Sequence, residues 1–189
     1  MDDLGEKVDR FLQEKAEELW NKVKSLGDPP YGMVVRLASS LESRPQVETA
    51  RVVIAELCNY YNVPVPLVLS YREAVDYVNQ LGPRRQSVQK ELTRMRDVKP
   101  GGAYGATLSS YGGKVRSPNM IILSDTLFTP PRDFTLNLTV FHEFFHWLSI
   151  QSMPPLEGPI LTAFISFIRE VEEDLTLQRA IHVLRKAGF

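Results

Sequence analysis

Residues 139–149, TVFHEFFHWLS, contain two of the chain's three histidines. His142 and His146 are four positions apart, so an α-helix would place both imidazoles on one face. Large apolar residues surround them, which favours a helix that is buried on most sides. The prolines and glycines that begin at Pro154 predict that this helix ends near Gln151.

The two histidines and the glutamate between them form a pattern with a specific chemistry. Neutral imidazoles are good ligands for Zn²⁺ in a tetrahedral site. Glu143 lies about 100° further round the helix than His142, so it is poorly placed as a third ligand. It can instead act as a general base on a zinc-bound water. The alternative, two histidines without partners in an apolar core, would be energetically costly.

A catalytic zinc needs a third protein ligand. The next predicted helix offers four acidic residues, at Glu170, Glu172, Glu173 and Asp174. Glu170 and Asp174 share a face, so one carboxylate can bind zinc while the other orients a histidine. Glu172 lies about 200° from Glu170, whereas Glu173 is only about 60° away and stays open as a ligand. We predict Glu170 as the ligand, because Glu173 is followed one turn later by Leu177, which cannot orient a histidine. A solvent-facing acidic surface is the alternative.

The rest of the chain predicts an α+β fold. Apolar spacing predicts helices over residues 3–25, 46–61, 72–81, 86–98 and 160–186. Strands are predicted over residues 65–70 and within 103–124, around a turn at Gly112-Gly113. Asp133 or Thr135 can cap the motif helix. We expect one domain over residues 1–189, with a mainly helical N-terminal part (1–99) and a catalytic part (100–189) that holds a small β-sheet with an edge strand, an active-site helix and a glutamate helix.

Composition excludes several classes of partner. The net charge of −1 gives no attraction to nucleic acid or to anionic membranes. Residues 83–99 are rich in arginine and lysine but hold no aromatic residue that could stack on bases, so we interpret them as a solvated face. The longest apolar run, residues 159–168, is shorter than the ~20 residues that a membrane helix needs. With a single cysteine, Cys58, and an acidic N-terminus, the expectation is a cytoplasmic protein.

The motifs carry a family resemblance. His142-Glu143-x-x-His146 followed by Glu170-x-x-x-Asp174 resembles the gluzincin metallopeptidases, and the short C-terminal half is similar to minigluzincins and to ImmA/IrrE-type proteases. The resemblance implies a zincin-like fold that binds Zn²⁺ and hydrolyses a peptide bond in a protein or peptide substrate. It also implies that the strand Met120-Ile121-Ile122-Leu123 is an edge strand that pairs with an extended substrate.

A second hypothesis is a non-catalytic or latent zinc-binding module for protein interactions. In this hypothesis the N-terminal helices bind a partner or cover the cleft. Three convincing ligands instead of four, and the presence of Glu143, favour catalysis. The chain has no third histidine of the metzincin pattern after His146. Tyr104 and Tyr111 are candidates for stabilising an oxyanion, because they lie near the proposed strand.

Overall fold

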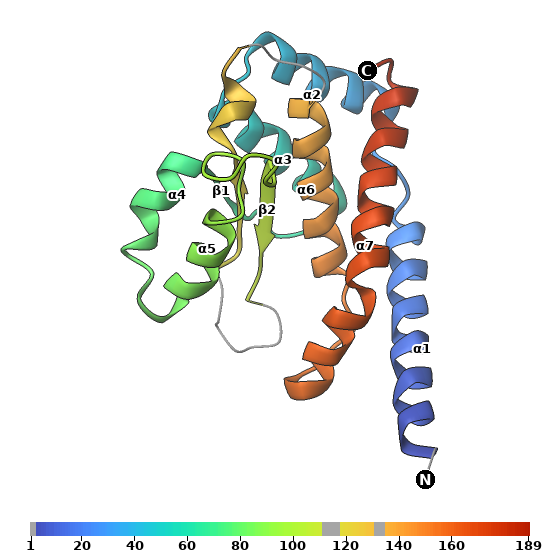
Figure 1. Cartoon of the computed structure of the whole chain (residues 1–189). Helices are drawn as coiled ribbons and strands as arrows, with labels where there is room; N and C mark the ends of the chain where they lie inside the picture. The colour runs from blue at the N-terminus through green and yellow to red at the C-terminus, as the bar shows by residue number, and fades with distance from the viewer. Residues whose placement is uncertain (1–2, 111–117, 131–134) are drawn as a thin grey trace.

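A computed structural model of the chain describes residues 3–110, 118–130 and 135–189. Within these ranges the chain forms seven α-helices and three short β-strands, which confirms the predicted α+β class (Figure 1). The helices are α1 (Asp3–Ser25), α2 (Tyr31–Ser43), α3 (Val47–Tyr61), α4 (Tyr71–Val78), α5 (Arg85–Leu92), α6 (Thr135–Gln151) and α7 (Gly158–Lys186). The strands are β1 (Leu67–Ser70), β2 (Gly105–Leu108) and β3 (Met120–Leu123), and 3-10 turns cover Gly82–Arg84 and Asp125–Phe128.

Helix α2 has no counterpart among the predicted elements. It begins directly after Pro30, so the prolines that end α1 also stand at the start of α2. Its buried residues have the spacing of one helix face, at Val34, Leu37, Ala38 and Leu41. Two predicted features, the cap at Asp133 and the turn at Gly112-Gly113, lie outside the described residues.

The sheet has the strand order β1-β3-β2. Strand β3 pairs in parallel with β1 and antiparallel with β2, and all four of its residues are fully buried. The prediction that Met120-Ile121-Ile122-Leu123 forms an edge strand, open to a substrate, is therefore wrong. A run of four large apolar residues is typical of a central strand that is covered on both faces. The edge next to α6 is β2.

Helix α6 lies at the centre of the largest hydrophobic core. It packs against α2, α3, α7 and β2, and buried residues occupy almost its whole circumference. Phe141, Phe144 and Trp147 are fully buried, and each such side chain contributes roughly 1.5–3 kcal/mol to folding. The indole N–H of Trp147 donates to the carbonyl of Pro64 at 2.7 Å. These contacts fix the position of the motif helix within the fold.

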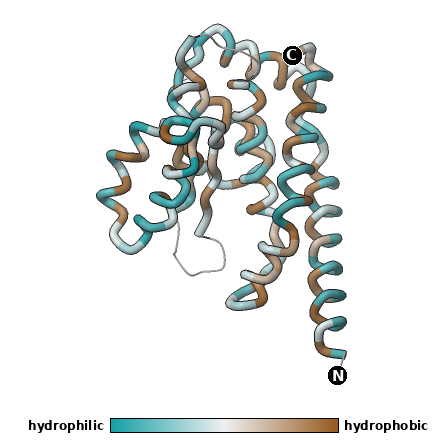
Figure 2. The backbone as a smooth tube through the Cα atoms, viewed as in Figure 1, coloured by the Kyte–Doolittle hydropathy of each residue, from teal (hydrophilic) through white to brown (hydrophobic). Residues whose placement is uncertain are grey.

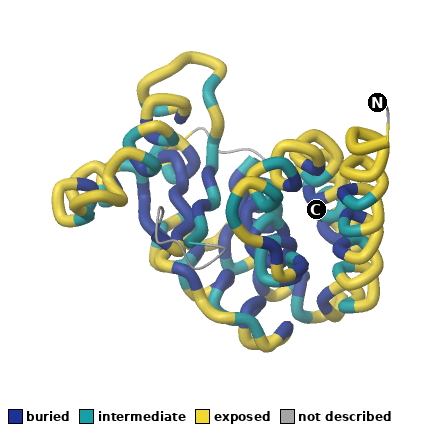
Figure 3. Tube along the Cα trace, turned by 90° about the horizontal axis from the view of Figure 1, so that it is seen from below, coloured by how far each residue is buried: buried dark blue, intermediate teal, exposed yellow. Residues whose placement is uncertain are grey.

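Helix α7 runs beside α6, and α1 covers its outer side (Figure 1). Polar and apolar residues alternate along α1 (Figure 2). The apolar face of α1 packs on α7, where Leu12 and Leu19 are buried in one cluster with Phe164 and Ile168. The outer face of α1 is exposed, whereas every residue of β3 and most residues of α6 are buried (Figure 3). None of the helices in the described ranges combines the length and the apolar character that a membrane crossing requires.

Candidate metal centre

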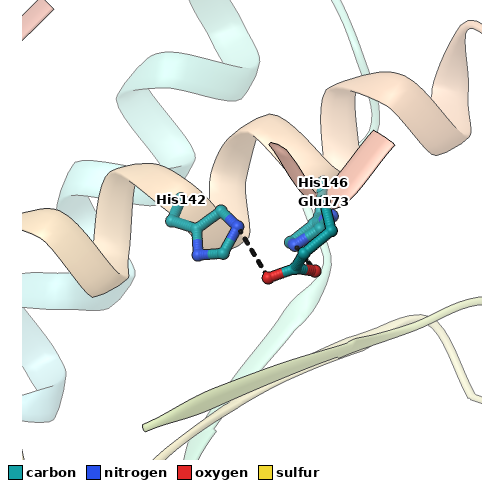
Figure 4. Close-up of side chains that lie close together, drawn as sticks. All are labelled: His142, His146 and Glu173. Atoms are coloured by element: carbon teal, nitrogen blue, oxygen red, sulfur yellow. Dashed lines mark ion pairs between the residues drawn. The ribbon is translucent and has the colours of Figure 1, made fainter. Parts of the chain in front are cut away.

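Three side chains from two helices converge on one point. His142 and His146 extend from α6, and Glu173 extends from α7 toward both of them (Figure 4). One donor atom from each residue lies within 4.8 Å of the others, so this group could hold a metal ion. Both predicted histidines are therefore members of the candidate site.

The contacts of the two histidines with the two oxygens of Glu173 are about as long as the distances between ligands around a small cation. Ligand atoms about 2.0–2.1 Å from a tetrahedral Zn²⁺ lie about 3.4 Å from one another. His142 Nε2 is 3.4 Å from Glu173 Oε1, and His146 Nε2 is 3.1 Å from Glu173 Oε2. Burial, together with the nearby His146, lowers the pKa of His142 to about 4, so this imidazole is neutral at pH 7. Its buried Nε2 has no hydrogen-bond partner among the described residues and can bind a cation.

Glu172 holds His146 from the opposite side of the ring. Nδ1 of His146 is 2.9 Å from each carboxylate oxygen of Glu172. Because a carboxylate only accepts hydrogen bonds, Nδ1 carries the proton and Nε2 faces Glu173. Burial opposes a charge on His146, but hydrogen bonds to Glu172 and Glu173 outweigh it and raise its pKa to about 10. The site therefore favours a positive charge, which a proton or a metal ion can supply.

Glu173, not Glu170, completes the donor group, which differs from the sequence prediction. The buried positions of α7 recur every fourth residue at Phe164, Ile168, Thr176 and Ala180, and Glu172 fills the missing place in this series. Glu172 and Glu173 both contact His146, so the turn that carries them faces α6. Glu170 and Asp174 line the neighbouring cleft and are not members of the donor group. The prediction took Asp174 as the residue that orients a histidine, but Glu172 makes that contact.

Glu143, the predicted base, is buried beside the donors. Its side chain is on α6, and the residue is only 5% exposed. The hydroxyl of Thr107 on β2 donates to Glu143 Oε2 at 2.6 Å. Burial raises the pKa of the carboxyl, although His146 and the Thr107 hydroxyl both favour its charged form. A raised pKa brings a carboxylate closer to the range in which it works as a base at neutral pH.

Strand β2 packs directly on Glu143. A Cβ atom on Gly105 would lie 2.5 Å from Glu143 Oε1, so only glycine fits here without a shift. Sequence reasoning identified neither Gly105 nor Thr107, because no motif connects them to a helix that begins some 30 residues later. The only sequence feature that could have pointed to them was the strand predicted within residues 103–124, which precedes the motif helix.

The donors open onto a cleft with a volume of about 1150 Å³. The face of α6 with His142 and His146 lines it, together with α7, β2 and the segment before β2. Tyr104 lines the cleft, and the Arg96 guanidinium lies 5.6 Å from the centre of its ring. Tyr111 lies outside the described residues. No described residue of α1–α4 lines the cleft, so these helices do not cover it.

The chain matches no protein-family model, and neither a curated protein nor a solved structure matches it. Its class therefore rests on its own fold and site. It is an α+β protein in which two long neighbouring helices carry a candidate metal centre of two histidines and one glutamate.

Proposed function

We propose that this chain is a zinc-dependent endopeptidase of the gluzincin type. The observation that carries the proposal is Glu143, a buried carboxylate on the same helix as two metal-donor histidines and outside the donor group itself. A structural zinc is usually enclosed by four protein ligands and needs no such carboxylate. Three donors among the described residues leave a position for water or substrate, and that position opens onto the cleft.

The residues of the site divide the chemistry between them. Zn²⁺, when bound, would polarise the scissile carbonyl and lower the pKa of the attacking water. Glu143 takes a proton from the water as its oxygen bonds to the carbonyl carbon, and returns the proton to the leaving nitrogen as the C–N bond breaks. Thr107 holds the carboxylate of Glu143 in place. Glu172 fixes the ring of His146, so that Nε2 stays directed at the donor group.

The substrate strand is reassigned from β3 to β2. One side of β2 pairs with β3, and Gly105, Ala106 and Thr107 line the cleft. An extended peptide in the cleft would therefore find β2 as the nearest strand edge, where backbone groups can pair with it. This arrangement also brings the peptide close to Glu143, because Gly105 and Thr107 both contact that side chain.

The proposal is tested on the purified chain of residues 1–189 with a peptide library and mass spectrometry. We expect about one zinc per chain by elemental analysis, because the donor group is a single cluster. New peptide termini should appear, and 1,10-phenanthroline should abolish them until zinc is added back. Tight zinc binding with no cleavage of the library would overturn the peptidase proposal and favour the non-catalytic zinc module.

A substitution at Gly105 tests the contact between β2 and the base. Because the added methyl group of Gly105→Ala would overlap the carboxylate of Glu143, we expect cleavage to fall by about 100-fold, as for other small displacements of reacting groups. Zinc content should stay at the parent level, since Glu143 is not a donor. Gly32→Ala on α2 is the matched control, because its Cβ would meet no atom within 4 Å. Parental cleavage by Gly105→Ala would show that this contact does not position the base.

A further inference from the structure

A second cavity lies outside the metal cleft, where the end of α1 meets α6 and α7. Its volume is about 420 Å³, within the range of small-molecule pockets. It shares no lining residue with the cleft. Because nothing in the proposed hydrolysis uses this cavity, any ligand that it binds would have a separate role.

Apolar side chains from three helices form most of the cavity wall. Trp20 and Val23 come from α1, Phe145 from α6 and Leu175 from α7. Leu175 is 47% exposed, which is high for a leucine, and it is part of the cavity lining. A ligand with a flat or branched hydrocarbon body would cover this surface and gain the hydrophobic free energy of that burial.

Ser149 supplies an unused polar group within the cavity. The residue is only 2% exposed and is part of the cavity lining. Across residues 3–110, 118–130 and 135–189, no hydrogen bond of its hydroxyl is seen, and the hydroxyl is not one of the fully enclosed atoms that lack a partner, so its oxygen is open to the cavity. A hydroxyl that faces the cavity can donate a hydrogen bond to, or accept one from, a polar atom of a ligand.

Positive charge lies at one end of the same cavity. Arg179 stacks 4.7 Å from the ring centre of Phe145, bonds to Asp28 Oδ1 at 3.3 Å and donates to the carbonyl of Gly27. Its guanidinium is therefore held in place and its charge is balanced by Asp28. Lys24 also lines the cavity and forms no ion pair with a described residue. One uncompensated positive charge thus remains beside the apolar wall.

We propose that this cavity is a binding site for a small amphipathic carboxylate. The hydrocarbon body would lie against Trp20, Val23 and Leu175, the carboxylate would pair with Lys24, and Ser149 would hydrogen-bond to a polar atom. The proposal stands on the cavity alone and does not depend on the proposed peptidase activity.

The probe is 4-phenylbutyrate, titrated into the ¹⁵N-labelled chain of residues 1–189 and followed by amide and indole N–H shifts. We expect saturable binding with Kd of about 1 mM or tighter, as for a ligand of this size. The largest shifts should fall on Trp20, Val23 and Ser149. Uncharged 4-phenylbutanol, which has nearly the same body, should bind at least about 5-fold more weakly, because the ion pair is lost.

Two variants and a control locate the site. Lys24→Gln should weaken phenylbutyrate binding by about 5-fold, and Val23→Trp should abolish it by filling the cavity. Lys22→Gln is the control on the same helix, and its lysine does not line the cavity. Far-UV circular dichroism confirms that each variant is folded. Shifts confined to the metal cleft, no saturation by about 20 mM, or parental binding by Lys24→Gln would each overturn the proposal.

Discussion

Replacing Glu143 with glutamine will abolish peptide hydrolysis and leave the metal bound. Glutamine has the size of glutamate and its amide oxygen can still accept from Thr107, but it cannot take a proton from water. Loss of general-base catalysis alone typically lowers the rate by about 10²–10⁴-fold. Metal content should not change, because the donor group consists of His142, His146 and Glu173. Cleavage assays and elemental analysis of the same preparation measure both effects.

The same variant has an expected effect on stability, with a defined sign. Burial raises the pKa of Glu143 in the folded chain. A group of this kind stabilises the fold at pH values below its unfolded pKa, and that contribution is lost as pH rises through the folded pKa. Glu143→Gln should therefore unfold at a temperature equal to or above the parent's at pH 7.

Two results would contradict the proposed role of Glu143. Cleavage by Glu143→Gln at the parent rate would remove Glu143 from the mechanism, and loss of zinc would make Glu143 a ligand instead.

Alanine at Glu173 will remove most of the affinity for zinc, whereas alanine at Glu170 will leave it near the parent value. Both residues are on α7 and line the same cleft, but only Glu173 belongs to the donor group. We expect Glu173→Ala to lose more than about 100-fold in affinity, beyond the penalty for a residue that only orients a ligand. Glu172→Ala should lose about 10–100-fold, because His146 then has no partner on Nδ1.

Competition titrations with a chelator measure these affinities on one scale. Asp174→Ala is a further control, since Asp174 is next to Glu173 in the chain and lies outside the donor group. If Glu170→Ala loses the metal while Glu173→Ala keeps it, the register of α7 against α6 differs from that described above. Equal losses in both variants would indicate that the two glutamates share the ion.

Local sequence was sufficient to predict the motif helix and its immediate chemistry. The spacing of His142 and His146 and the prolines after Gln151 act within one or two turns of helix, where backbone geometry alone sets which side chains meet. The helix boundaries at Ser25, Tyr61 and Gln151 were predicted for the same reason, since a proline or glycine follows each within a few residues. The α+β class also followed from the order of such segments.

Tertiary packing decided the remaining features of the site. The sequence offers three glutamates within four positions of α7, at Glu170, Glu172 and Glu173. Only the packing of α7 on α6 shows which of them face His146. Glu172 lies midway between the buried positions Ile168 and Thr176. This spacing indicates that Glu172 faces the protein interior, but it could be recognised only once the buried face of α7 was known.

In the sheet, too, the sequence predicted the strand but not the strands that pair with it. Residues 120–123 predicted a strand from their composition, but pairing with β1, some 50 residues earlier, made that strand central. Its central position made β2 the edge beside Glu143, with Gly105 and Thr107 in contact with the base. The sequence by itself determined most of the elements, with α2 as the exception, and the two histidines, because these depend on neighbours along the chain. The third donor, the substrate edge and the support of the base were decided by contacts between distant segments, which no local pattern encodes.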